Sequence, residues 1–166
     1  MENPVNDFTA VNAEDGLSLS VVGDTYRLVI TGEQTGGAYA AIDMLVPPQG
    51  GPGPHAHAGF QESFYVLEGE VVIQTKSDTF TARKGSFVNI PLGGVVHGFK
   101  NLSDTTARLL CMAVPAGLDE FFREVGTPVS AGTFLPPPVM SPEEQERLRS
   151  IAEKYGQELF PPDYFD

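Results

Sequence analysis

Two of the chain's three histidines, His55 and His57, lie one residue apart, and Glu62 follows five positions later. Side chains in a β-strand repeat every second residue, so both imidazoles would point the same way, with their Cα atoms about 6.6 Å apart. That spacing lets them bind one metal ion. If Glu62 begins the next strand, its carboxylate returns to the same face, and His97 could approach from across a small barrel. Three imidazoles and one carboxylate suit a divalent transition metal.

Each of these residues also has an ordinary explanation. A His-x-His pair occurs in solvated loops or against aromatic rings such as Phe60 and Phe64, and Glu62 is one of 22 acidic residues. His97 alone would be a satisfied or an exposed histidine. The metal hypothesis uses every histidine in the chain, together with a carboxylate at a workable offset. From the spacing alone, both explanations stay open.

The elements that must position these residues are short strands. Apolar and polar residues alternate along them, and turn residues recur about every eight to twelve positions, which predicts an all-β sandwich or barrel. The predicted strands cover residues 17–22, 25–31, 38–46 and 107–114, and residues 62–90 form further strands divided by turns at 68–69, 77–78 and 84–85. A chain of 166 residues suits one domain, so we predict that residues 1–166 form a single domain.

The C-terminal region is the helical exception. Ser141 is the predicted N-cap, Pro142 the first helical residue, and Glu144 completes a capping box, while Gly156 supplies a stop signal. These signals predict a helix over about 141–156. A shorter helix is predicted over residues 117–126, and the proline-rich stretch FLPPPVM predicts an extended connector between the two.

Composition excludes several classes of partner. Twenty-two acidic against ten basic residues give a net charge of −12, which opposes binding to nucleic acids and to anionic membranes. No apolar run approaches the roughly 20 residues that span a bilayer. The N-terminal segment MENPVNDFTAVNAEDG has neither a basic start nor an apolar stretch, so we expect no signal peptide and a cytoplasmic location. The single cysteine, Cys111, lies in the apolar run LLCMAV and is predicted to be a buried, inert thiol.

Two stretches resemble the paired sequence motifs of the cupin family. The first has a glycine, a spacer, His-x-His, four residues, a glutamate, six residues and a glycine; the second has a glycine, five residues, a proline, a glycine turn, a histidine and an asparagine. The matching positions are Gly51, His55, His57, Glu62 and Gly69 in the first, and Gly85, Pro91, His97 and Asn101 in the second. The second stretch departs from the motif, because three residues rather than two separate Gly93 from His97. We expect Asn101 to be a turn or cap residue and not a ligand.

The resemblance implies a fold and a cofactor. It implies a small jelly-roll (double-stranded β-helix) barrel, here followed by the C-terminal helix, with the barrel motifs at about 51–101. It also implies one divalent transition metal per chain, bound by His55, His57, Glu62 and His97, and the ligand types suit Fe, Mn, Ni, Co, Cu and Zn alike. Family habit implies a homodimer.

A second resemblance concerns activity. The single-cupin layout, with VPAGLDEFFREVGTP after the last strand and a C-terminal helix, looks like bacterial quercetinase-like cupins. It implies a dioxygenase that cleaves a flavonol-like or other chelating aromatic substrate with O2. Glu62 would be catalytic as the acceptor of the substrate's hydroxyl proton, and Phe64, Val66 and Phe99 would line the substrate pocket.

Two alternatives remain. One is a non-catalytic, metal-bearing cupin that binds a small ligand. The other is a metal-dependent isomerase or decarboxylase acting on a small polar acid. The second would need an inward-facing cation near the metal, and the sequence offers none: Arg83 and Lys84 fall in a predicted turn, and Lys100 is out of register with His97.

Overall fold

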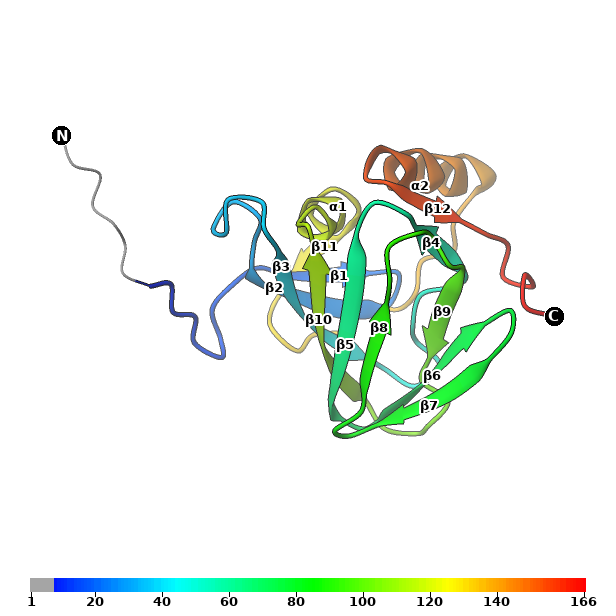
Figure 1. Cartoon of the computed structure of the whole chain (residues 1–166), viewed down its shortest axis with the longest axis horizontal. Helices are drawn as coiled ribbons and strands as arrows, with labels where there is room; N and C mark the ends of the chain where they lie inside the picture. The colour runs from blue at the N-terminus through cyan, green and yellow to red at the C-terminus, as the bar shows by residue number, and fades with distance from the viewer. Residues whose placement is uncertain (1–7) are drawn as a thin grey trace.

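The computed structural model describes residues 8–166 and has two antiparallel sheets that form a barrel (Figure 1). The seven-stranded sheet has the order β11-β1-β2-β3-β10-β5-β8, and the five-stranded sheet has the order β12-β4-β9-β6-β7. This confirms the expected all-β jelly roll with a C-terminal helix. Residues 1–7, part of the segment that argued against a signal peptide, lie outside the described residues.

The strands alternate with short turns along most of the chain. Their bounds are β1 Ser18–Val21, β2 Asp24–Ile30, β3 Ala40–Val46, β4 His55–His57, β5 Gln61–Glu68, β6 Glu70–Thr75, β7 Thr79–Arg83, β8 Phe87–Ile90, β9 His97–Lys100, β10 Ala107–Val114, β11 Thr127–Val129 and β12 Gln157–Leu159. The predicted strands agree with these bounds to within two residues. The predicted turns at Gly69 and Gly85 are also confirmed, and both glycines have the positive φ that such turns favour.

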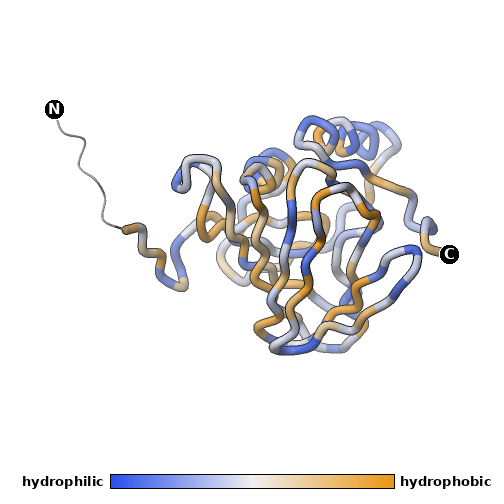
Figure 2. The backbone as a smooth tube through the Cα atoms, viewed as in Figure 1, coloured by the Kyte–Doolittle hydropathy of each residue, from blue (hydrophilic) through white to orange (hydrophobic). Residues whose placement is uncertain are grey.

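Alternation along the strands fills the barrel. On β10 every second residue is buried, and Leu109 and Cys111 point into the core. Figure 2 shows the same pattern as orange residues that alternate with paler ones along the strands. Cys111 is fully buried, as expected, and burial raises the pKa of its thiol well above the ordinary value, so it stays protonated.

Two helices cover one end of the barrel, α1 (Leu118–Val125) and α2 (Pro142–Lys154) (Figure 1). The predicted capping box of α2 is present: the Ser141 hydroxyl accepts from the Glu144 amide at 3.2 Å, and the Glu144 carboxylate accepts from the Ser141 amide at 2.7 Å. Lys154 donates a hydrogen bond to Glu124 of α1, which ties the two helices together. Within residues 8–166, neither helix has the length and apolar composition needed to cross a membrane.

Two short strands were not predicted. The strand β11 pairs with β1, and β12, which follows α2, pairs with β4. Each has three residues, too few to show a period in the sequence. The second of these pairings matters for the site, because β4 carries His55 and His57.

Candidate metal centre

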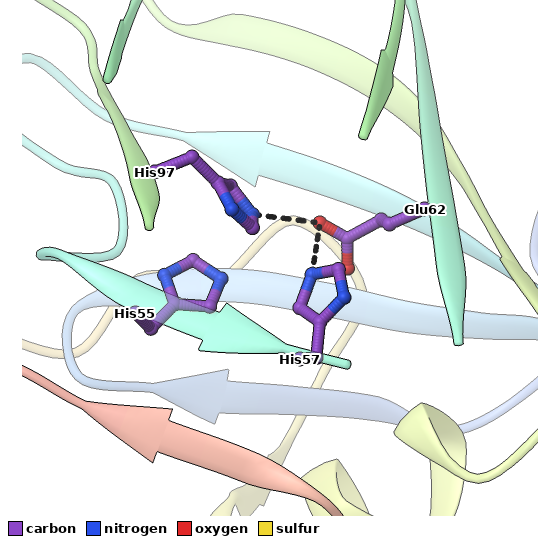
Figure 3. Close-up of side chains that lie close together, drawn as sticks. All are labelled: His55, His57, Glu62 and His97. Atoms are coloured by element: carbon purple, nitrogen blue, oxygen red, sulfur yellow. Dashed lines mark ion pairs between the residues drawn. The ribbon is translucent and has the colours of Figure 1, made fainter. Parts of the chain in front are cut away.

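Four buried side chains converge inside the barrel from three strands (Figure 3). His55 and His57 come from β4, His97 from the neighbouring strand β9, and Glu62 from β5 in the opposite sheet. The pairing of β4 with β9 sets His55 directly opposite His97. One nitrogen or oxygen atom from each of the four residues lies within 4.8 Å of the others. The structure therefore brings together all four residues that the sequence singled out, His97 included.

Backbone carbonyls fix the orientation of all three imidazoles. The Nδ1 atoms of His55, His57 and His97 lie 2.8, 3.0 and 2.9 Å from the carbonyl oxygens of Gly53, Phe60 and Val95, respectively. A carbonyl oxygen can only accept a hydrogen bond, so each Nδ1 carries the proton and each Nε2 keeps a free lone pair. The Nε2 atoms of His57 and His97 lie 3.9 and 4.0 Å from Glu62 Oε1. Ligand histidines of metal sites are held in this way.

Burial suppresses charge on every member of the cluster. It lowers the pKa of His55 to about 3, helped by the neighbouring His97, and that of His97 to about 4, and it also lowers the pKa of His57. Burial raises the pKa of Glu62 to about 8. The imidazoles are thus neutral at pH 7, which is the form that binds metals.

The donor set fits one divalent transition metal. Among the described residues, Nε2 of His57 and Nε2 of His97 are buried without any hydrogen-bond partner. Such orphaned atoms each cost about 1–3 kcal/mol unless something binds them. Donors bound at about 2.0–2.2 Å lie at most about 4.4 Å apart across the ion, close to the spread observed here. Nitrogen and oxygen donors suit Fe, Mn, Co, Ni, Cu and Zn.

Gly51 allows the ligand strand to approach β9. Its φ is +121°, and a Cβ atom at this position would lie 2.1 Å from the carbonyl oxygen of Phe99. Only glycine fits so close an approach in this backbone conformation. On the other side of β4, the backbone pairs with β12, and the Phe160 amide donates to the Pro54 carbonyl at 3.0 Å. His55 and His57 therefore lie on a strand that is paired along both edges, with β9 on one side and β12 on the other.

A cavity of about 240 Å³ lies beside the cluster, with His55 and Glu62 in its wall. The rest of the lining is mainly apolar and comes from the barrel, from both helices and from the C-terminal segment. It includes Phe99, Leu118, Phe121, Phe122, Leu148 and Phe160. The helices thus form one side of the cavity, a contribution that the sequence analysis did not foresee.

The structure places the three predicted pocket residues differently from one another. Phe99 lines the cavity. Phe64 and Val66 do not: both are almost fully buried in the hydrophobic core. The physical reason is depth. All three side chains face inward, but Phe64 lies farther along β5 than Glu62 and packs edge-to-face on Phe99, with ring centroids 5.3 Å apart.

Residues 42–113 match the sequence profile described as Cupin domain. This part of the chain is thus similar to the cupin domain. A protein from Thermotoga maritima described as a predicted oxalate decarboxylase has the same fold, with a TM-score of 0.58 and 20% identity over 64% of this chain and 99% of that one. KdgF from Halomonas sp. has a TM-score of 0.57 and 16% identity over 66% of this chain and 96% of that one. At these identities, the likeness shows the fold alone.

A curated relative is similar over part of its length. The quercetin 2,3-dioxygenase of Bacillus subtilis (strain 168) is 26% identical over 109 residues, which cover 66% of this chain and 32% of that protein. The match thus spans about a third of the length of that relative.

The sequence analysis does not single out a polar pair that lies in the cavity wall. Asp24 falls between the predicted strands over 17–22 and 25–31, but it begins β2, so Asp24 and Tyr26 share the inner face. The Tyr26 hydroxyl donates to Asp24 Oδ2 at 2.7 Å, and the Gly51 amide donates to Asp24 Oδ1 at 3.1 Å. Burial raises the pKa of Asp24 from 3.8 to about 6, although both hydrogen bonds oppose that shift. The signal in the sequence was an aspartate two residues before an inward-facing tyrosine.

Replacing Asp24 with asparagine should change how stability depends on pH. Between about pH 4 and pH 6 the folded chain holds a proton on Asp24 that the unfolded chain has released. The contribution of Asp24 to the free energy of unfolding therefore falls as pH rises through this window, by about 3 kcal/mol in all. Asp24→Asn cannot titrate. Urea unfolding at several pH values measures the effect. From about pH 4 to pH 6, the free energy of unfolding of the wild type should fall by about 2–3 kcal/mol relative to that of the variant. A difference in free energy of unfolding that does not change with pH would contradict the prediction.

Proposed function

We propose that His55, His57, Glu62 and His97 bind one divalent transition metal and that this cupin is a dioxygenase acting on a chelating aromatic substrate of the flavonol type. The observation that carries the proposal is the apolar, aromatic-walled cavity with His55 and Glu62 in its wall. An apolar cavity of about 150 Å³ accepts a benzene ring. The larger cavity here gives room for a substituted ring next to the metal site.

The charge of the cavity favours this substrate class over small acids. Within residues 8–166, no lysine or arginine lines the cavity, while Asp24 and Glu62 do. The metal offers one cation, but a decarboxylase or isomerase for a small polar acid would also need a cationic side chain to pair with the anionic group. The similarity to the quercetin 2,3-dioxygenase of Bacillus subtilis supports the same choice.

The residues of the chain have distinct roles in this proposal. The metal, when bound, supplies Lewis-acid chelation of the substrate's neighbouring hydroxyl and carbonyl oxygens and a site for O2. Glu62 accepts the hydroxyl proton, because its carboxylate lies in the cavity wall within the cluster that would hold the metal. Phe99 and Phe122 pack against the rings and exclude water. Both oxygen atoms of O2 enter the cleaved product, so no external reductant is required.

Oxygen consumption tests this proposal. Protein is loaded in turn with Fe, Mn, Co, Ni, Cu or Zn. With at least one of these metals it should consume O2 in the presence of a flavonol. The amount of O2 consumed should equal the amount of flavonol lost, measured from the visible absorbance of the flavonol. A Glu62→Gln variant should turn over at least about 100-fold more slowly, because the proton acceptor is gone. If the wild type binds flavonols tightly without O2 uptake with every metal, the protein is instead a non-catalytic ligand-binding cupin.

A further inference from the structure

Among residues 8–166, one polar side chain in the cavity wall has an amide nitrogen without a hydrogen-bond partner and belongs to neither the metal cluster nor the Asp24–Tyr26 pair. Gln157 lies on β12, directly opposite His57 in the antiparallel register. Residues opposite each other in a sheet point to the same face, so Gln157 faces inward beside the metal ligands and lines the cavity. Its side chain emerges from the C-terminal segment, far from the cupin motifs in sequence.

The amide of Gln157 is buried and unsatisfied. The residue is 6% exposed, and Gln157 Nε2 has no hydrogen-bond partner among the described residues. Leaving such a donor unpaired costs about 1–3 kcal/mol. The neighbouring lining offers no relief, because Leu159 and Phe160 are apolar.

The other polar groups of the cavity are already engaged. Both carboxylate oxygens of Asp24 accept hydrogen bonds, one from the Tyr26 hydroxyl and one from the Gly51 amide. His55 and Glu62 belong to the metal cluster. Among the described side chains that line the cavity, Gln157 is therefore the donor that stays available to a molecule there.

We infer that Gln157 is a specificity-determining residue, whose Nε2–H donates a hydrogen bond to an acceptor oxygen of the ligand held at the metal site. The ligand class is an aromatic molecule with a carbonyl or ionised hydroxyl oxygen next to its chelating group. This inference rests on the proposed function for the place of the ligand, but it concerns binding and not turnover.

Ligand binding without O2 tests the inference. Gln157→Leu keeps the size of the side chain and removes the donor, and Gln145→Leu makes the same replacement at an exposed position of α2. Two probes are titrated into metal-loaded protein under nitrogen: 3-hydroxyflavone, which carries the acceptor oxygen, and toluene, which carries none. Gln157→Leu should bind 3-hydroxyflavone at least about tenfold more weakly than wild type. The same variant should bind toluene as tightly as wild type or more tightly, because the substitution removes an unpaired polar amide from an otherwise apolar cavity wall.

Metal content and the circular dichroism spectrum, measured on each variant, separate this role from a structural one. Should Gln157→Leu lose metal or fold poorly, Gln157→Met gives a second test, because it keeps the length of the side chain and has no hydrogen-bond donor. Equal binding of 3-hydroxyflavone by wild type and by the folded, metal-loaded variant overturns the inference alone. Failure of the proposed function appears instead as absence of O2 uptake by the wild type. If the wild type binds neither probe, both are overturned.

Discussion

Replacing His57 with alanine should give a folded protein that no longer retains metal. His57 is almost fully buried, and its Nε2 has no hydrogen-bond partner among residues 8–166. Removing it takes away one of four ligands, and we expect metal affinity to fall by about 100-fold or more, since even outer-shell partners of a metal site are worth about 10–100-fold. The fold itself should survive. The lost stacking on Phe60, at a centroid distance of 4.1 Å, is offset in part by removal of an orphaned polar atom.

Metal analysis of protein purified without a metal-affinity tag measures this effect. Wild type should carry close to one equivalent of a transition metal, and His57→Ala much less, with both showing the same β-rich circular dichroism. The matched control is Glu158→Ala, an exposed residue on β12 opposite Ala56, which should retain metal like the wild type. Full metal content in His57→Ala would contradict the assignment of this residue as a ligand.

The part of the site that follows from local rules could be predicted from the sequence. His55 and His57 share a face because a strand alternates, and Glu62 returns to that face because β5 begins after a short loop. His97 follows from the second motif, and its extra loop residue does not displace it from the cluster. The turns at Gly69 and Gly85 follow from the positive φ that glycine tolerates.

The parts that depend on distant segments could not be predicted. The pairing of β12 with β4 brings Gln157 beside His57 across 100 residues of sequence, and no local pattern specifies it. Alternation indicates which face a residue occupies but not its depth in the barrel, so Phe64 and Phe99 could not be told apart until their packing was known. Both cases depend on contacts between segments that are far apart in the sequence, and the residues of one segment alone do not specify such contacts.

Association and location stay predictions. The outer face of the larger sheet carries two partly exposed aromatic residues on paired strands, Tyr65 on β5 and Phe87 on β8. Strand edges and faces of this kind are compatible with the expected homodimer. The expected cytoplasmic location rests on the sequence alone.

Replacing Asn101 with alanine should destabilise the protein strongly without removing a metal ligand. Asn101 is fully buried at the end of β9, and it is not part of the metal cluster. Its Nδ2 donates to the carbonyl oxygens of Val46 and Thr105 at 2.9 and 2.7 Å, and its Oδ1 accepts from the amide and hydroxyl of Ser103 at 3.0 and 2.7 Å. The predicted turn role is thereby confirmed: one side chain closes the loop between β9 and β10 and ties it to the end of β3.

Alanine at this position leaves the buried Val46 carbonyl without its partner and removes four hydrogen bonds at once. We expect the free energy of unfolding to fall by about 3 kcal/mol, which for a chain of this size lowers Tm by about 6–12 °C. The control is Asn89→Ala. At the surface, Asn89 Oδ1 accepts from the Ser63 hydroxyl and its Nδ2 donates to Gln61 Oε1, and these contacts should contribute less than about 0.5 kcal/mol. Equal unfolding midpoints for the two variants would contradict the prediction, because they would mean that the loop between β9 and β10 forms other hydrogen bonds when Asn101 is replaced. A large loss confined to Asn101→Ala would instead show that this asparagine anchors the loop after β9, the strand that presents His97.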